Sequence, residues 1–205
     1  MDLLVTDPVT GRKTGLTASV RRALKAMAKA RLPYCVIGAT ALAVRGLPRM
    51  TRDLDLAVPL EEQLRAAAVL RAAGFRATTP VGSADDPEPM VVFVDPTTDV
   101  EVDLMGAAGD PERTVIREAR PAMVFGARAP VASLEHLLLL YLYSNQPRHL
   151  GDFASIVQSG KADLPKAERM LHEMHREMVP AWRRRVKRVL APPPPPSRPK
   201  PRKLR

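Results

Sequence analysis

The stretch Asp-Leu-Asp-Leu-Ala-Val at residues 53–58 constrains the fold of this chain more than any other segment. Successive side chains of a β-strand point to opposite faces, so the pattern predicts a strand with Asp53 and Asp55 on one face and Leu54 and Leu56 in a core. Like charges on one face repel unless a cation or hydrogen-bond donors lie between them, and carboxylates are hard ligands that suit Mg²⁺ or Mn²⁺. The alternative interpretation is an edge strand whose solvent face is acidic.

A glycine turn precedes this acidic strand. The apolar run at residues 34–37 is followed by Gly38, Ala39 and Thr40 and then by a helical stretch that ends near Gly46. This order predicts a strand, a turn and the N-terminus of a helix. Glycine lets the backbone approach a ligand closely, and the free amides at a helix start favour an anion such as a triphosphate. We therefore interpret Gly38, Ala39 and Thr40 as nucleotide-binding residues.

Basic and hydroxyl side chains lie between the turn and the acids. Arg45, Arg49, Thr51 and Arg52 could contact phosphate oxygens or a nucleoside. Because 32 of the 205 residues are Lys or Arg, the alternative for each arginine is a solvated surface residue. Arg49 and Thr51 are the better candidates of the four.

Together these residues resemble the minimal DNA polymerase β-like nucleotidyltransferases, and most closely the branch that contains the AbiEii-like and MenT-like toxins of bacterial toxin–antitoxin systems. The resemblance rests on the apolar strand, Gly38, the helix and the run at residues 49–55, and it covers roughly residues 16–160. It implies an α+β fold, with a mixed sheet flanked by helices and a helical C-terminal half. In that family the strand acids bind two metals, and a third carboxylate completes the site from a nearby strand.

A second strand pair offers this third carboxylate. Residues 90–94 are a strong strand run, residues 95–99 are rich in turn formers, and residues 100–105 alternate again between apolar and acidic side chains. Taken alone, Glu-Val-Asp at residues 101–103 is an ordinary exposed strand. In the context of the first two acids, a hairpin here would carry Asp103 alongside them.

The resemblance also implies the chemistry. Asp53 and Asp55 would hold two Mg²⁺ or Mn²⁺ ions, and Asp103 would bind the ion that activates an acceptor hydroxyl and could take its proton. A nucleoside triphosphate (NTP) would be the second substrate. A nucleotidyl group would move from the NTP to the acceptor hydroxyl, with pyrophosphate as the other product.

The chain departs from the family pattern in the part that contacts the nucleotide. Tyr141 occupies the place of a phosphate-binding lysine, and Gln146 and His149 fall where relatives place groups that assist the phosphates or position the acids. Arg148 and Asp152 are kept, so we interpret both as nucleotide-binding residues.

The net charge of +10 is concentrated at the C-terminus. Ten basic residues and no acid follow Ala181, so residues 1–180 are formally neutral. We predict a disordered, basic, Pro-rich tail at residues 191–205, because it has little apolar surface and a polyproline bias. The basic end could bind RNA phosphates; the alternative is a solubilising or partner-docking tail. The candidate RNA contacts are Arg183, Arg184, Lys187 and Arg188.

The rest of the sequence predicts the domain organisation and the compartment. We expect a nucleotidyltransferase α/β core at residues 1–130 and a helical region packed on it at residues 131–190. Cys35 is the single cysteine, which excludes an internal disulfide and suits a reducing cytoplasm. The longest apolar run, residues 137–143, is too short to span a bilayer, so we expect a cytoplasmic protein with no membrane partner.

Three functional hypotheses stay open. The first is a metal-dependent nucleotidyltransferase that modifies RNA, at the tRNA 3′ end, as a toxin with a cognate antitoxin. The second is an enzyme of the same fold that modifies a small molecule such as an aminoglycoside, or a protein hydroxyl. The third is a catalytically silent relative that binds nucleotide or RNA.

Overall fold

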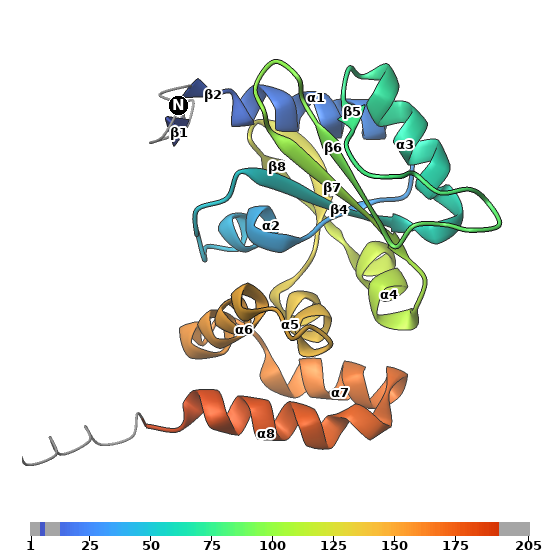
Figure 1. Cartoon of the computed structure of the whole chain (residues 1–205). Coiled ribbons are helices and arrows are strands. Elements are labelled where there is room, and N and C mark those ends of the chain that lie inside the picture. The colour runs from blue at the N-terminus through green and yellow to red at the C-terminus, as the bar shows by residue number, and fades with distance from the viewer. Residues whose placement is uncertain (1–4, 7–12, 193–205) are drawn as a thin grey trace, which may run out of the picture.

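A mixed seven-stranded sheet organises the part of the chain that the computed structural model describes, residues 5–6 and 13–192 (Figure 1). The strand order is β5-β6-β7-β4-β3-β9-β8. The strands are β3 (Cys35–Val36), β4 (Asp53–Pro59), β5 (Arg76–Ala77), β6 (Met90–Val94), β7 (Glu101–Ala107), β8 (Arg120–Val124) and β9 (Ala127–Val131). Two further short strands, β1 (Val5–Thr6) and β2 (Lys13–Thr14), pair with each other.

The acidic strand β4 lies near the centre of the sheet. It runs antiparallel to β3 and parallel to β7, and β6 and β7 form the predicted hairpin. Leu54 and Leu56 are fully buried, while Asp53 and Asp55 on the opposite face are half-buried. The alternation predicted for residues 53–56 is therefore confirmed.

Two long helices cover one side of this sheet. Helix α1 (Leu16–Lys29) and helix α3 (Gln63–Ala72), which follows the 3-10 turn η1 (Leu60–Glu62), lie together at the top of Figure 1. In α1 the residues Val20, Leu24 and Met27 recur at helical spacing and are buried, which anchors the helix by its apolar stripe. The short helix α2 (Gly38–Val44) follows β3, and α4 (Asp110–Glu118) follows β7.

The C-terminal half is helical. Helices α5 (Leu134–Leu142), α6 (Pro147–Ser159), α7 (Leu164–Met174) and α8 (Val179–Leu190) gather below the sheet in Figure 1, with the 3-10 turn η2 (Arg176–Met178) between the last two. Trp182 of α8 is buried edge-on against Phe153 of α6, with ring centroids 5.6 Å apart. The predicted α+β class, with a mixed sheet flanked by helices and a helical C-terminal half, is confirmed. Residues 193–205, which include most of the predicted tail, lie outside the described residues.

A buried polar cluster fixes the β6–β7 turn on α1. The Asp95 carboxylate accepts a hydrogen bond from Ser19 Oγ at 2.5 Å and pairs with Arg22 Nη2 at 2.5 Å. Thr97 donates to it through both its backbone amide and its hydroxyl. Burial by itself would raise the pKa of Asp95, but the hydrogen bonds from Ser19, Thr97 and Thr98 outweigh it and lower the pKa to about 2. The cluster thus holds the turn that leads into β7, the strand that carries Asp103.

Within the described part of the chain, none of the helices has the length and apolar character needed to cross a bilayer.

Candidate active site

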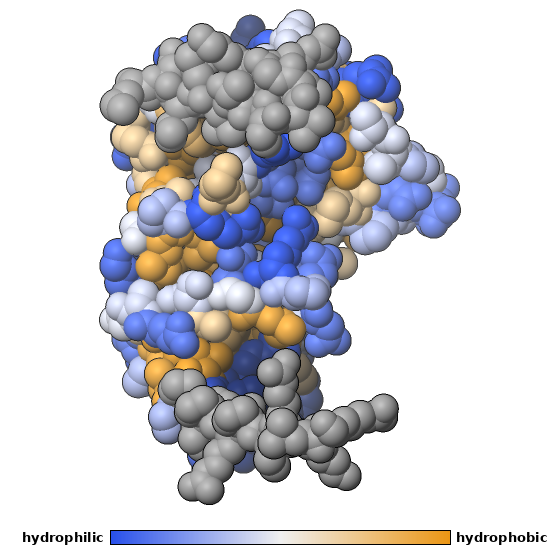
Figure 2. Space-filling view, turned by 60° about the vertical axis from the view of Figure 1, so that its left-hand side comes forward, coloured by the Kyte–Doolittle hydropathy of each residue, from blue (hydrophilic) through white to orange (hydrophobic). Residues whose placement is uncertain are grey.

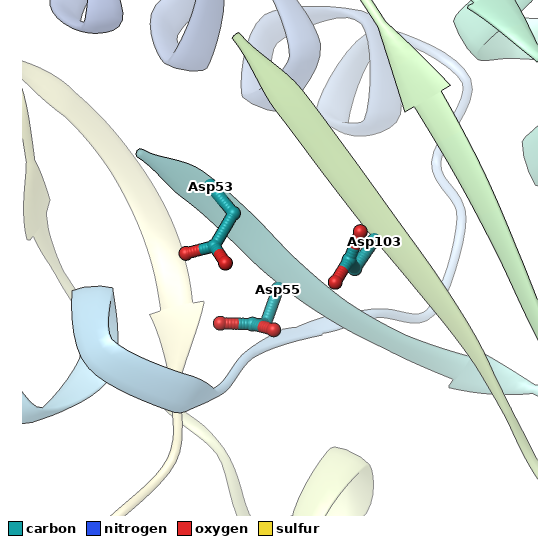
Figure 3. A group of neighbouring side chains, drawn as sticks. All are labelled: Asp53, Asp55 and Asp103. Carbon is teal, nitrogen blue, oxygen red and sulfur yellow. The ribbon is translucent and has the colours of Figure 1, made fainter. Parts of the chain in front are cut away.

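Three carboxylates converge on one face of the central strands (Figure 3). Asp53, Asp55 and Asp103 each offer an oxygen that lies within 4.8 Å of those of the other two. Asp53 and Asp55 share a face of β4, and the parallel register pairs Asp55 with Asp103 of β7. The structure thus brings together the three acids that the sequence singled out.

The electrostatics of this cluster favour a bound cation. Burial raises the pKa of Asp55 to about 7, and the neighbouring carboxylates of Asp53 and Asp103 add to the rise. Burial, with the charges of Asp53 and Glu101, raises the pKa of Asp103 to about 6. Asp103 Oδ1 is buried and has no hydrogen-bond partner among the described residues. Three close acids with an unpartnered oxygen fit a divalent cation bound by oxygen ligands.

Gly38 lies against the site for a reason that differs from the expected one. Its φ is +61°, and a Cβ at this position would lie 1.9 Å from Asp55 Oδ2. The Ile37 amide donates to the Asp55 carbonyl at 3.0 Å, which holds the turn beside β4. The sequence indicated a close approach to a ligand, whereas the nearest group is the Asp55 side chain. The side chains of Ala39 and Thr40 are buried in α2, and their backbone amides, in the first turn of the helix, are the candidates for phosphate contact.

The other residues predicted to bind nucleotide divide into two groups. Thr51 Oγ1 donates a hydrogen bond to the Asp53 carboxylate, and Arg148 Nη1 lies 4.0 Å from Asp53 Oδ2. Arg49 Nε pairs with Asp152 Oδ1 at 2.9 Å. Thr51 and Arg148 therefore contact or approach the triad, whereas Arg49 and Asp152 are partners of each other. The side chain of Arg52, the remaining residue of the set, is exposed.

Helix α5 adds a residue whose surroundings the sequence did not reveal. Tyr141 is buried, and its ring stacks on His149 with centroids 4.9 Å apart. Burial raises the pKa of Tyr141, and the nearby charges of Asp152 and Asp55 raise it further. Tyr141, which stands where relatives place a phosphate-binding lysine, is therefore an uncharged side chain near the acids.

Arg45, which also lies between the turn and the acids, makes structural contacts that the sequence did not indicate. Its Nε donates to the Ala132 carbonyl at 2.9 Å and its Nη2 to the Val131 carbonyl at 2.7 Å. These bonds tie the end of α2 to the end of β9. No signal in the sequence distinguishes this arginine from the others around it.

A pocket of about 580 Å³ adjoins this region between α2 and the β8–β9 hairpin. Its walls are mostly apolar, and Thr40, Arg49 and Thr51 are its polar members. Figure 2 shows a band of hydrophilic side chains across one face of the molecule, with apolar areas above and below it.

The four residues predicted to contact RNA lie on α8 but not on one surface. Arg183 and Lys187 line a groove between α7 and α8, where Arg183 Nη2 pairs with Glu168 Oε1 at 2.6 Å. Arg184 and Arg188 line a separate pocket against the α5–α6 connection. Both pairs are spaced by four residues, so each forms its own row along the helix.

Comparison with known proteins gives a family and a fold. The sequence profile of a family described as uncharacterised nucleotidyltransferase matches residues 6–177. A search of curated proteins found no match. The solved structures described next are each under 25% identical to the chain, so they bear on its fold alone.

Among the solved structures that match is the antibiotic-resistance factor ANT(2'')-Ia, with a TM-score of 0.55, 19% identity, and coverage of 82% of this chain and 95% of that one. The lincosamide antibiotic adenylyltransferase LnuA matches with a TM-score of 0.50 and 12% identity, over 71% of this chain and 97% of that one. A nucleotidyltransferase structure from Thermotoga maritima matches with a TM-score of 0.50 and 17% identity, over 61% of this chain and 81% of that one.

Proposed function

The chain belongs to the uncharacterised nucleotidyltransferase family, and from this premise we propose that it transfers a nucleoside monophosphate from an NTP to an acceptor hydroxyl at the Asp53–Asp55–Asp103 triad. The observation that carries the proposal is the convergence of three carboxylates around the buried, unpartnered Oδ1 of Asp103. A fold has nothing to gain from such mutual repulsion unless the acids bind cations.

The triad would hold Mg²⁺ or Mn²⁺. Bound there, divalent ions would supply neutralising charge for the phosphates and for the attacking and leaving oxygens. The hydrogen bond from Thr51 orients the Asp53 carboxylate for this task. Gly38 keeps the backbone of α2 close to Asp55 without a clash.

The remaining roles follow from the neighbours of the triad. Arg148 is half-exposed beside Asp53, so its guanidinium can bind a phosphate oxygen of the NTP. The Arg49–Asp152 pair links the segment before β4 to α6 and positions both sides of the site. As the acceptor oxygen bonds to the α-phosphorus and the bond to pyrophosphate breaks, we assign the hydroxyl proton to Asp103.

We further propose RNA as the acceptor, at the tRNA 3′ end, for a toxin that works with a cognate antitoxin. The support is the run of arginines and one lysine on α8, continued by the basic residues of the C-terminal segment. A small-molecule acceptor is the second candidate, because the apolar pocket beside Arg49 and Thr51 has a volume typical of small-ligand sites.

A transfer assay tests the proposal. The protein is incubated with each α-labelled NTP, Mg²⁺ or Mn²⁺, and either total RNA or a panel of aminoglycosides and lincosamides. Transfer of label should be lost in an Asp53→Asn, Asp55→Asn variant and kept in Asp85→Asn, which removes a charge from an exposed loop side chain. Labelled RNA would support the first acceptor, and a labelled antibiotic would support the second. Absence of transfer to any acceptor with either metal would refute the enzymatic proposal.

A further inference from the structure

We propose that the pocket between the α5–α6 connection and α8 binds a backbone phosphate of a polynucleotide acceptor; this inference rests on the proposed transfer to RNA. The pocket has a volume of about 380 Å³. Arg184, Arg185 and Arg188 line one side, and Tyr143 and Asn145 line the other. A guanidinium offers a planar set of donors that matches two phosphate oxygens at once.

The charges in this pocket have no internal counterpart. No carboxylate lines it, and among the described residues neither Arg184 nor Arg188 makes a hydrogen bond or an ion pair. Arg185 donates through Nη1 to the Tyr141 carbonyl at 2.9 Å, which holds its guanidinium at the pocket wall. Three like charges gathered by the fold are stabilised by a bound anion.

Two carboxylates influence the pocket from outside its lining. The charges of Glu177 and Glu112 add to the rise that burial causes in the pKa of Tyr143. Glu177 accepts a hydrogen bond from His175 at 3.0 Å. Neither carboxylate lines the pocket, whose charged lining residues are all arginines.

The other basic row of α8, Arg183 and Lys187, contains a basic residue that is paired within the fold. Arg183 donates from Nε and Nη2 to Glu168 of α7, so its charge is compensated inside the fold. Arg184 is the next residue along the helix, yet it faces the arginine pocket instead of an acid. The contrast within one helix distinguishes the pocket from a uniformly solvated basic surface.

A short path connects the pocket to the triad. Asn145 lines the pocket, and the next residue, Gln146, accepts a hydrogen bond from Arg148 Nε at 3.0 Å. Arg148 in turn lies 4.0 Å from Asp53. Asn145 and Arg148 are three residues apart, so their Cα atoms lie within about 10 Å of each other. An RNA strand that ends at the triad could therefore place an upstream phosphate against α8.

The pocket selects among acceptor classes. The NTP must place its phosphates at the triad for transfer to occur. A separate phosphate site on α8 would therefore bind the acceptor and not the NTP. Polycationic acceptors such as aminoglycosides would be repelled by three uncompensated guanidinium groups. A polynucleotide has the anionic backbone that complements them.

The test uses two variants that each remove two positive charges. Arg184→Ala, Arg188→Ala empties the pocket of its free arginines, and the control Arg71→Ala, Arg76→Ala removes two exposed arginines of α3 and β5. Binding of a short fluorescein-labelled single-stranded RNA is measured by anisotropy across a range of NaCl concentrations, with EDTA present so that no transfer occurs. Circular dichroism melting confirms that both variants fold.

We expect the pocket variant to bind about tenfold more weakly at moderate salt, with a slope of log affinity against log salt shallower by about 1.4, the value for two lost single-strand phosphate contacts. The control should stay within about twofold of the unmodified protein. Equal losses in both variants, or no loss in the pocket variant, would overturn the proposal. A higher KM for NTP with unchanged RNA binding would assign the pocket to the triphosphate and would also overturn it.

A third variant separates this inference from the proposed function. Asp53→Asn, Asp55→Asn should lose transfer and keep its RNA affinity, because the triad and the pocket are lined by different residues. If the unmodified protein transfers no nucleotide to RNA, but Arg184→Ala, Arg188→Ala still weakens RNA binding, the proposed transfer is refuted and the proposed phosphate site is supported.

Discussion

Gly38 and Asp55 are so close that a methyl group on Gly38 would lie 1.9 Å from the Oδ2 of Asp55. The glycine also has a φ of +61°, in the region that residues with a Cβ avoid. A single position therefore sets both the turn after β3 and the space in which the Asp55 carboxylate can sit.

Substitution of Gly38 should damage activity more than it damages the fold. We expect Gly38→Ala to lower the free energy of unfolding by about 1–3 kcal/mol through backbone strain and the clash, and to reduce transfer at least about tenfold by displacing Asp55. The control is Gly74→Ala, since Gly74 has a φ of +90° and a methyl group there would meet no atom within 4 Å. Gly74→Ala should lower the free energy of unfolding measured in urea, because of backbone strain, and should keep full transfer activity. Equal activity in both variants would contradict the assignment.

Divalent cations should stabilise the protein through the triad. We expect the melting temperature to rise with Mn²⁺ or Mg²⁺ concentration, because a ligand that binds only the folded state shifts unfolding by mass action. In Asp55→Asn the melting temperature should no longer rise with metal concentration. In EDTA this variant should melt at or above the temperature of the unmodified protein, because one repelling charge is gone. Differential scanning calorimetry measures both effects. A metal increment that survives in Asp55→Asn would exclude the triad as the binding site.

The lowered pKa of Asp95 should make the free energy of unfolding depend on pH in the acid range. Its pKa is lowered to about 2 in the folded protein, against 3.8 for the free side chain. A depressed carboxyl pKa contributes stability above the unfolded value, and that contribution disappears as the pH falls from about 4 through about 2. Asp95→Asn should therefore cost about 2 kcal/mol at pH 6 and much less near pH 2, measured by urea unfolding. Asp85→Asn, with its exposed side chain, should show no such difference. A cost that does not change with pH would argue against an ionised Asp95 in the cluster.

Arg49 and Asp152 should be energetically coupled. Asp152 is buried, so Arg49→Ala leaves a carboxylate without its partner and should destabilise the protein by about 1–3 kcal/mol. The double variant Arg49→Ala, Asp152→Ala should lose less than the sum of the two single changes. A double-mutant cycle in urea measures the coupling energy. Additive losses would show that the pair is not an interacting unit.

The local alternation of residues was sufficient to predict the strands and the acids they carry. In residues 53–56 the pattern reads directly as two carboxylates on one face and two leucines in the core, because alternation is a property of the strand backbone itself. The hairpin that ends in β7 could be read in the same way. Asp53 and Asp55 were thus available from the residue pattern alone, whereas Asp103 was singled out because the family resemblance implies a third carboxylate on a nearby strand.

Only the tertiary structure decided how these acids and their neighbours meet. The pairing of Asp55 with Asp103 is a matter of register between strands that are distant in sequence. The same holds for the partnership of Arg49 with Asp152, which the sequence offered as two separate nucleotide contacts, and for the arginine pocket on α8. The physical reason is that side-chain alternation depends on a few consecutive residues, whereas register, ion pairing and helix orientation depend on the packing of the whole chain.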